Sequence, residues 1–266
     1  MQKPFAKRMH LTDSFLHSAF FLLPSDCAAV IPCFNEAANI GTVVAGVKKF
    51  LPAVIVVDDG SSDDTAQQAR AVGAKVIHSG KNSGKGAALR LGWRHAVELG
   101  FDWVLMLDGD GQHATEDIPK ILAAGSMAAT LVVGNRMDHA DAMPPVRRFV
   151  NRWMSRRLSH LTGKHLPDSQ CGFRLAHLDT LLRLALTANR FEIESEMLVA
   201  FLAAGEEIAF VPVQTVYLTG GSKIRPLADT WRWWRWWLAQ RRKIPLGAVA
   251  APNHAPAIEN GTAAIA

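Results

Sequence analysis

A short apolar run that ends at two carboxylates constrains the fold of this chain more than any other feature. Residues 103–107 read Trp-Val-Leu-Met-Leu, and Asp108, Gly109 and Asp110 follow directly. An uninterrupted apolar run of this length is typical of a strand that is buried on both faces of a sheet. Because ligands bind beyond the carboxyl ends of strands in open α/β sheets, we expect both aspartates at the rim of a cleft.

The same turn offers oxygen ligands for a hard divalent cation. Asp108 and Asp110 supply carboxylates and Gln112 supplies an amide oxygen, and phosphate oxygens and water would complete the coordination shell. An Asp-Gly-Asp-Gly turn is also a common way to end a strand, because both residue types tolerate tight backbone geometry. The metal interpretation therefore depends on motifs elsewhere in the chain.

Further apolar runs alternate with segments of helical periodicity. Strands are expected at residues 28–32, 54–57, 75–78 and 103–107, and helices are expected to Phe50, toward Val72 and over residues 84–99. The second strand also ends at carboxylates, Asp58 and Asp59, which a role in helix capping does not explain. This alternation predicts a doubly wound, mostly parallel sheet.

Composition is typical of a one-domain protein. Of the 266 residues, 49% are hydrophobic and 20% are charged, and no apolar run reaches the roughly 18 residues that a membrane span needs. The three cysteines, Cys27, Cys33 and Cys171, lack C-x-x-C spacing. This spacing argues against a disulfide framework and a zinc site, and it favours a reducing cytosol.

A glycine-rich segment at residues 80–86 is a second candidate for phosphate binding. It reads Gly-Lys-Asn-Ser-Gly-Lys-Gly, which is one residue short of a P-loop and has Gly86 in place of the hydroxyl residue. Free backbone amides and the charge of Lys85 at the start of a helix nevertheless suit a diphosphate. The alternative is a loop with solvated lysines.

Four motifs, in this order and spacing, resemble family 2 glycosyltransferases of the GT-A fold, and most of all the dolichyl-phosphate mannose synthase-like branch. They are Ile-Pro-Cys-Phe-Asn-Glu at 31–36, Val-Asp-Asp-Gly-Ser-Ser-Asp at 57–63, Asn-Ser-Gly-Lys-Gly at 82–86 and Asp-Gly-Asp-Gly-Gln-His at 108–113. The resemblance implies a three-layer α/β/α sandwich over residues 28–222, which follows an N-terminal extension of residues 1–27.

The resemblance also implies a donor site. The nucleotide pocket would be lined by Pro32, Phe34, Glu36, Val57 and Asp59, and the donor would also meet Lys85, Asp108, Gly109 and Lys223. Asp108, Asp110 and Gln112 would hold Mg²⁺ or Mn²⁺ on the donor diphosphate. Arg136 would approach the donor phosphates, so that Asp110, Arg136 and Asp168 become the candidate catalytic residues.

Later segments extend the resemblance toward the acceptor. Residues 168–175 resemble the family's D-x-x-x-G-F-R turn, residues 191–197 its acidic helix start, and residues 211–217 and 221–223 its closing strand and donor-gating loop. Helix capping is the alternative role for Asp168 and for the acidic residues within 192–196. Thr215 and Tyr217 stand where the mannose synthase pattern has an arginine before a Tyr-Gly-x-Ser-Lys run, which leaves the sugar and the donor base open.

The resemblance implies a single displacement with inversion. Breaking the anomeric bond of a nucleotide sugar releases a diphosphate, and a divalent cation lowers the barrier by neutralising the charge that grows there. A polyprenyl phosphate, the favoured acceptor, is already ionised, whereas a hydroxyl of a glycolipid, polysaccharide or pigment precursor needs a base, for which Asp168 is the candidate. Alternatives of other classes are a sugar-phosphate nucleotidyltransferase and a non-catalytic nucleotide-sugar-binding protein.

Tryptophan and basic residues gather near the C-terminus. Residues 231–237 hold five of the eight tryptophans, and the net charge of +5 is concentrated between residues 223 and 243. On a helix with ~100° per residue, the basic residues and most of the indoles fall in opposite arcs, which favours a helix lying flat on an anionic bilayer. Packing on the protein core or on a partner is the alternative, and nucleic acid is a weaker one.

These patterns complete the expected organisation. A second basic stretch surrounds Trp153 on a predicted helix, residues 223–243 form the amphipathic segment, and residues 244–266 form a disordered tail. We expect a cytoplasmic enzyme that attaches peripherally to the inner face of the cell membrane.

Overall fold

One seven-stranded sheet organises the molecule. The computed structural model describes residues 22–125, 129–216 and 226–243, and every structural statement below refers to these residues. The strands are β1 (Cys27–Cys33), β2 (Ala53–Asp58), β3 (Lys75–His78), β4 (Trp103–Met106), β5 (Ala129–Asn135), β6 (Arg174–His177) and β7 (Glu207–Pro212). They are arranged in the order β3-β2-β1-β4-β6-β5-β7, and β6 alone is antiparallel to its neighbours. The predicted mostly parallel sheet is confirmed.

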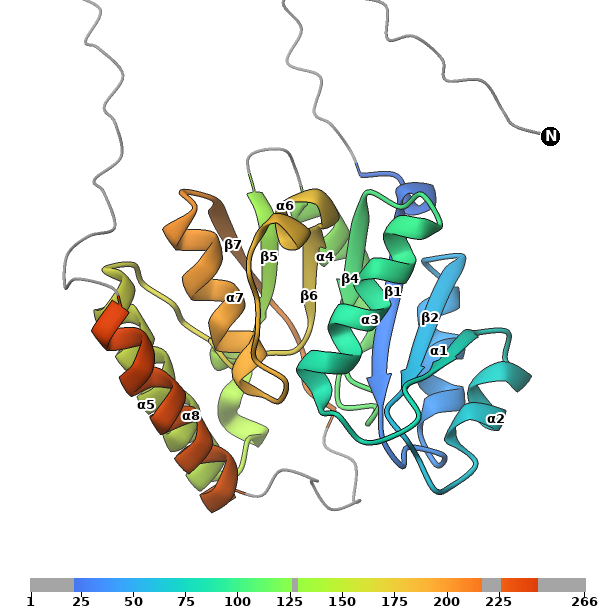
Figure 1. The fold of residues 1–266 in the computed structure, drawn as a ribbon, viewed down its shortest axis with the longest axis horizontal. Helices are drawn as coiled ribbons and strands as arrows, with labels where there is room; N and C mark the ends of the chain where they lie inside the picture. Colours follow the sequence, from blue (N-terminus) through green and yellow to red (C-terminus); the bar gives the residue numbers. More distant parts are fainter. Residues whose placement is uncertain (1–21, 126–128, 217–225, 244–266) are drawn as a thin grey trace, which may run out of the picture.

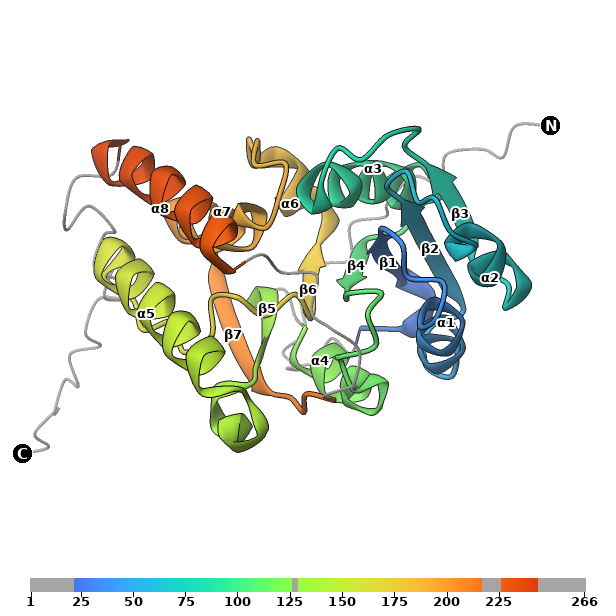
Figure 2. The same ribbon diagram turned by 90° about the horizontal axis from the view of Figure 1, so that it is seen from below.

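Helices cover both faces of this sheet. They are α1 (Ile40–Lys48), α2 (Thr65–Ala71), α3 (Lys85–Glu98), α4 (Ile118–Ala124), α5 (Pro145–Thr162), α6 (Leu178–Arg183), α7 (Glu192–Ala203) and α8 (Pro226–Lys243). Figure 2 shows α3, α6 and α7 on one face and α1 and α4 on the other, which gives the predicted three-layer sandwich. Helices α5 and α8 lie side by side beyond the β7 edge (Figure 1).

The order of the strands creates a switch point between β1 and β4. From β1 the chain continues to β2 and β3 on one side, whereas β4 pairs with β1 on the other side, with Val30 opposite Met106. Ligands of open α/β sheets bind at such points. Because β6 is antiparallel, it begins at the same edge, where Arg174 pairs with both Met106 and Val133. The turn before β6 is thereby brought to the switch point.

The chain leaves the sheet earlier than its sequence indicates. The closing strand was expected over residues 211–217, but β7 ends at Pro212. Beyond it, Gln214 N donates to Asp117 Oδ2 at 2.7 Å, and Thr215 forms an isolated bridge with His113. These contacts with the segment after β4 draw residues 213–216 across the carboxyl edge of the sheet, so the predicted bounds of the closing strand are wrong.

Several predictions fall on segments that the structure does not describe. The N-terminal extension up to residue 21, the loop of residues 217–225 with Lys223, and the tail from residue 244 lie outside the described residues. Within the described ranges, no helix combines the length and the apolar character that crossing a membrane requires.

Close contact between α3 and the sheet depends on Gly92. A Cβ atom at this position would overlap Cγ1 of Val30 and lie 3.1 Å from Cγ2 of Val57. We expect Gly92→Ala to lower the free energy of unfolding by ~1–3 kcal/mol, because overpacking forces a well-packed core apart. Urea unfolding of the purified protein measures this loss.

Gly41 of α1 provides the matched control. A Cβ there would meet no atom within 4 Å. We therefore expect Gly41→Ala to raise the free energy of unfolding by ~0.5–1 kcal/mol through the lower backbone entropy of the unfolded chain. Equal effects of the two substitutions would contradict the close approach at Gly92.

Candidate active site

A buried lysine balances the first carboxylate of the turn after β4. Lys85 Nζ lies 2.5 Å from Asp108 Oδ1 and 2.5 Å from Glu194 Oε1. The side chains of Lys85 and Glu194 are 10% and 7% exposed, whereas that of Asp108 is 30% exposed. His113 Nε2 lies 3.3 Å from the other oxygen of Asp108. Asp108 thus has a partner at each oxygen.

Mutual attraction keeps this cluster ionised. Burial alone would lower the pKa of Lys85, but the charges of Asp108 and Glu194 raise it well above its usual range. Burial would likewise raise the pKa of Asp108, but Lys85, followed by His113, holds it well below its usual range. The cluster therefore sets one buried lysine between two carboxylates, and the charge of Asp108 has a cationic partner before any ligand binds.

The surroundings of Gly172 explain why the D-x-x-x-G-F-R turn has a glycine at this position. A Cβ at this position would lie 2.7 Å from Lys85 Nζ, 2.8 Å from Asp108 Oδ2 and 3.1 Å from Glu194 Oε1. The backbone of the turn therefore packs directly on the charged cluster and shields it from water. No larger residue fits without displacing the ion pairs.

Asp110 is the second carboxylate of the turn, and it faces the cleft differently from Asp108. It is half-buried, its Oδ1 accepts a hydrogen bond of 3.0 Å from Gln112 N, and none of the described basic side chains forms an ion pair with it. The amide oxygen of Gln112 accepts a bond of 3.0 Å from Arg147 Nη1. Of the two carboxylates among the predicted metal ligands, Asp108 forms an ion pair with Lys85, whereas Asp110 forms none with a described basic side chain.

These oxygens fit a hard divalent cation that shares its ligands with a substrate. No group of three or more His, Cys, Asp or Glu side chains in the described ranges could hold a metal ion by itself. Mg²⁺ commonly uses one or two carboxylates and takes its remaining ligands from substrate phosphates and water. Asp110, with Asp108 beside it, suits that mode of binding.

The predicted nucleotide residues divide into two groups. Phe34 is 39% exposed, and Pro32 and Glu36 are half-buried beside it at the end of β1. Val57, by contrast, is completely buried in the core, so its side chain cannot line a pocket. Asp59 is 3% exposed and accepts bonds from Ser79 Oγ, Ser83 N and Gly84 N. The structure thus gives Asp59 the task of holding the glycine-rich turn.

The amides of the glycine-rich turn also have internal partners. Gly86 N and Ala87 N donate to the carbonyl oxygen of Asn189 at 2.8 and 3.2 Å, and Gly84 N donates to Asp59 at 2.7 Å. The predicted diphosphate cradle at this turn is therefore wrong for these amides. Lys85 reaches the donor site through Asp108 instead.

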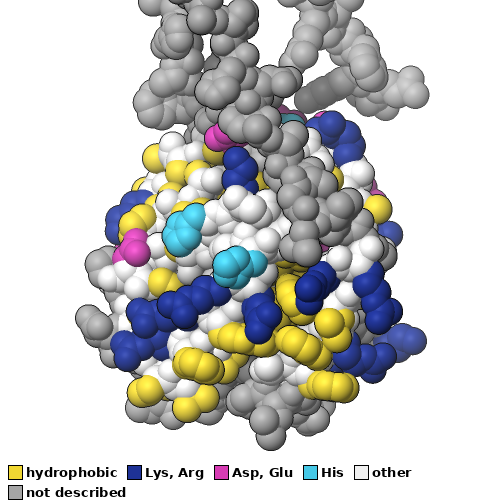
Figure 3. All heavy atoms as spheres, turned by 90° about the vertical axis from the view of Figure 1, so that its left-hand side faces the viewer, with side chains coloured by type: hydrophobic (Ala, Val, Ile, Leu, Met, Phe, Trp, Pro, Cys, Tyr) yellow, Lys and Arg dark blue, Asp and Glu magenta, His cyan; other side chains and the backbone are white. Residues whose placement is uncertain are grey.

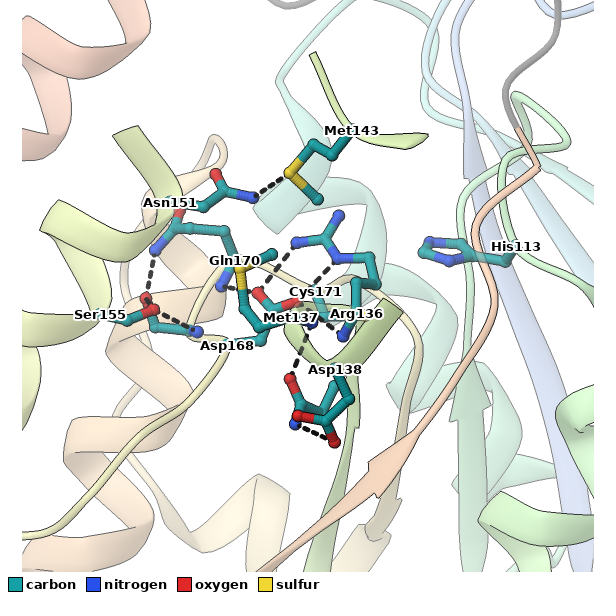
Figure 4. A network of polar contacts seen from close by, with 12 residues as sticks. His113, Arg136, Met137, Asp138, Met143, Asn151, Ser155, Asp168, Gln170 and Cys171 are labelled. Atoms are coloured by element: carbon teal, nitrogen blue, oxygen red, sulfur yellow. Dashed lines mark hydrogen bonds and ion pairs between the residues drawn. The ribbon is translucent and has the colours of Figure 1, made fainter. Parts of the chain in front are cut away.

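Arg136 and Asp168 form a second buried ion pair (Figure 4). Arg136 Nε donates to Asp168 Oδ2 at 2.8 Å, Nη2 donates to Oδ1 at 2.9 Å, and the backbone amide of Arg136 donates to Oδ2 at 3.1 Å. Arg136 is 5% exposed and Asp168 is fully buried. Burial would raise the pKa of Asp168, but the charge of Arg136 and these hydrogen bonds lower it.

This pairing changes the predicted roles of both residues. An ionised carboxylate whose two oxygens are held by a guanidinium is a poor proton acceptor, which argues against Asp168 as a general base. In this ion pair Nε and Nη2 of Arg136 already donate to Asp168, so these two nitrogens are not free to bind a phosphate in bidentate fashion. Cys171 nearby is no substitute nucleophile, because burial raises the pKa of its thiol to about 12.

The chain resembles known glycosyltransferases in both sequence and structure. Residues 28–183, more than half of the chain, match the model of glycosyl transferase family 2. Glycosyltransferase AglJ of Haloferax volcanii is 33% identical over 213 residues, which cover 77% of this chain and 69% of that protein. The undecaprenyl-phosphate mannosyltransferase of Micrococcus luteus is 27% identical over 224 residues, which cover 77% of this chain and 92% of that protein.

The chain belongs to glycosyltransferase family 2.

A solved structure of the same fold carries a nucleotide and a metal. Glucosyl-3-phosphoglycerate synthase from Mycobacterium tuberculosis, in complex with Mg²⁺ and uridine diphosphate, is 26% identical with a TM-score of 0.63, over 83% of this chain and 80% of that one. The family 2 chain described here is thus a glycosyltransferase of the GT-A fold that uses a nucleotide sugar. Neither a nucleotidyltransferase nor a non-catalytic binding protein describes it.

Two tryptophans of α8 in this glycosyltransferase face its own core. Trp233 and Trp237 of α8 are 2% and 5% exposed, and Trp233 Nε1 donates to Ser195 Oγ at 2.8 Å. Trp153 of α5 contacts Trp233 with a distance of 5.4 Å between ring centroids, and Arg157 lies 5.5 Å from the rings of both Trp153 and Trp237. For Trp233 and Trp237 the expectation that the indoles face a bilayer is wrong, and packing on the protein is the observed alternative, whereas Trp231 is 60% exposed.

Three functional contacts escaped sequence reasoning. Glu194 was expected in the acidic helix start on the acceptor side, with helix capping as the alternative, and its pairing with Lys85 joins residues 109 positions apart. Arg147 was seen only as one member of a basic stretch, although it lies in the first turn of α5, whose start the prolines at 144 and 145 already indicate. Ser195, which receives both Trp233 Nε1 and the Gln170 amide, carries no signal in the sequence.

The buried pair is expected to matter for folding. Arg136→Met should lower the free energy of unfolding by ~3–5 kcal/mol, because it leaves the charge of Asp168 buried without a partner. The double variant Arg136→Met/Asp168→Asn should recover at least half of this loss, because no charge is then stranded. Urea unfolding compares the two, with Arg183→Met at the exposed pair with Asp179 as a control that should change little. A double variant no more stable than Arg136→Met would contradict this role.

Proposed function

We propose that this glycosyltransferase moves a sugar, with inversion, from a nucleotide diphosphate sugar to a polyprenyl phosphate. The reaction depends on Mg²⁺ or Mn²⁺ and takes place at the cytosolic surface of the membrane. The sugar and the nucleotide base stay open. Transfer to a hydroxyl acceptor, the alternative from the sequence, requires a base at the acceptor side.

The pairing of Asp168 with Arg136 is the observation that carries this choice of acceptor. Asp168 was the candidate base, and its carboxylate is buried, ionised and held at both oxygens. A phosphate monoester is ionised at neutral pH and attacks without losing a proton to the enzyme. An acceptor that arrives as an anion therefore suits this site better than a hydroxyl.

The donor end of the site is supplied by the turn after β4. A divalent cation bound there would neutralise the charge that develops on the departing diphosphate. Asp110 is the residue that would hold it, with Asp108 kept in place by Lys85 and His113. Arg147 lies at the same edge, with its Nη1 3.0 Å from Gln112 Oε1. Its positive charge suits either the donor or the acceptor phosphate.

Relatives support this acceptor class. The Micrococcus luteus relative is an undecaprenyl-phosphate mannosyltransferase. Structures of the mycobacterial synthase also hold Mn²⁺ or Mg²⁺ with uridine diphosphate. Both observations concern those proteins, and they agree with the chemistry that the residues of this chain offer.

The metal assignment predicts the effect of one substitution. In a transfer assay with a panel of radiolabelled nucleotide sugars and undecaprenyl phosphate in micelles, Asp110→Asn should slow formation of the lipid-linked sugar by on the order of a hundredfold or more. The reason is that a lost charge-stabilising contact in the transition state typically costs this much. Glu116→Gln in the following exposed turn is the matched control and should leave the rate unchanged. Undiminished transfer by Asp110→Asn, or by the parent in EDTA, would refute the assignment.

A further inference from the structure

An exposed apolar pair marks the start of α5. Val146 and Phe149 are 71% and 70% exposed, the highest fractions among the large hydrophobic side chains of the described residues. They lie on the first two turns of the helix, after the exposed prolines Pro144 and Pro145. Hydrophobic side chains of this size are rarely left in water together without a partner.

Arginines surround this pair along one side of the helix. A hollow of about 340 Å³ opens there, lined by Pro145, Arg148, Phe149, Arg152, Trp153 and Arg156. The three arginines follow one another at intervals of four residues, so that they project from one face of the helix. None of the three forms an ion pair with a described acidic side chain.

The neighbouring helix adds to the same charge. Helix α5 contains no acidic residue, and the one acidic residue of α8, Asp229, pairs with Arg232. Arg235, Arg241 and Arg242 of α8 are exposed, and so is Trp231 at 60%. Figure 3, which looks at this side of the molecule, shows Lys and Arg side chains flanking a band of hydrophobic side chains.

We propose that this face of α5, with Val146 and Phe149 inserted and Arg148, Arg152 and Arg156 at the phosphates, is the surface that docks on an anionic phospholipid bilayer. The inference rests on the proposed function, and it moves the membrane contact from the indoles of α8 to another helix. A helix binds an anionic bilayer when its apolar side chains insert into the interface and basic side chains beside them contact the lipid phosphates.

The charge pattern favours a bilayer over a protein partner. A protein interface of useful strength has a contiguous apolar centre, whereas here two apolar side chains stand among arginines whose stems can extend along an apolar surface. The position of the face also fits the chemistry. Arg147 lies between Val146 and Arg148 in the chain and reaches Gln112 of the site, so a lipid phosphate at the bilayer surface would arrive beside it.

Vesicle sedimentation tests this surface. With vesicles of phosphatidylcholine and phosphatidylglycerol at low salt, the triple variant Arg148→Gln/Arg152→Gln/Arg156→Gln should bind about a hundredfold more weakly than the parent. Each basic residue at an anionic surface contributes about fivefold. Val146→Asn/Phe149→Asn should also weaken binding, by about tenfold, because it removes the apolar insertion. Neutral phosphatidylcholine vesicles should retain little of any variant.

A charge-matched control lies at the opposite end of the sheet. Lys49→Gln/Arg70→Gln/Lys75→Gln removes three exposed charges near α2 and β3, and should bind anionic vesicles almost as the parent does. Equal loss in the control and in the α5 triple variant would overturn the proposal. So would equal binding of the parent to neutral vesicles, or no sedimentation of the parent at low salt, which would favour a protein partner for this face.

A second assay separates this inference from the proposed function. Transfer to a short-chain, water-soluble polyprenyl phosphate without vesicles should proceed equally in the parent and in the α5 triple variant. Absence of transfer in the parent would refute the proposed function, whatever the vesicles show. Transfer that is lost in the triple variant alone would overturn the docking role, because it would place these arginines at the reaction itself.

Discussion

The ion pairs of Lys85 with Asp108 and Glu194 are the interaction on which the rest of the site depends. They join the start of α3, the end of β4 and the start of α7, and the backbone at Gly172 closes over them. Removing Lys85 would leave the buried Glu194 and the partly buried Asp108 without their shared cation, which is far more costly than losing an exposed pair. The cluster therefore sets the position of the turn that carries Asp110.

The site contains two ion pairs, and each of them compensates the charge of one carboxylate. Lys85 pairs with Asp108 beside the turn after β4, and Arg136 pairs with Asp168 before β6. With both carboxylates neutralised in this way, Asp110 is left as the carboxylate for a cation, and no base is left at Asp168. A glycosyltransferase built in this manner suits a donor that leaves as a diphosphate and an acceptor that arrives as a phosphate.

The edge of the sheet at which Asp108 and Asp110 lie could be predicted from the sequence, because the carboxyl ends of parallel strands lie at one edge. The carboxylates after residues 57 and 107 lie at the same edge of the sheet, because β1 pairs in parallel with both β2 and β4. Partners of the charges were beyond reach, because Lys85 and Glu194 are 109 residues apart and only the packing of α7 brings them together. The tryptophans of α8 misled for another reason. An amphipathic helix has the same residue pattern whether its apolar face meets a bilayer or, as here, α5 and α7.

A comparison of two acceptors tests the central claim most directly. The rate of sugar transfer should be measured with undecaprenyl phosphate and with undecaprenol, under the same conditions and with the same nucleotide sugar. Our account predicts a lipid-linked product from the phosphate and none from the alcohol, because the site holds its candidate base in a buried ion pair. Comparable product from the alcohol would contradict it.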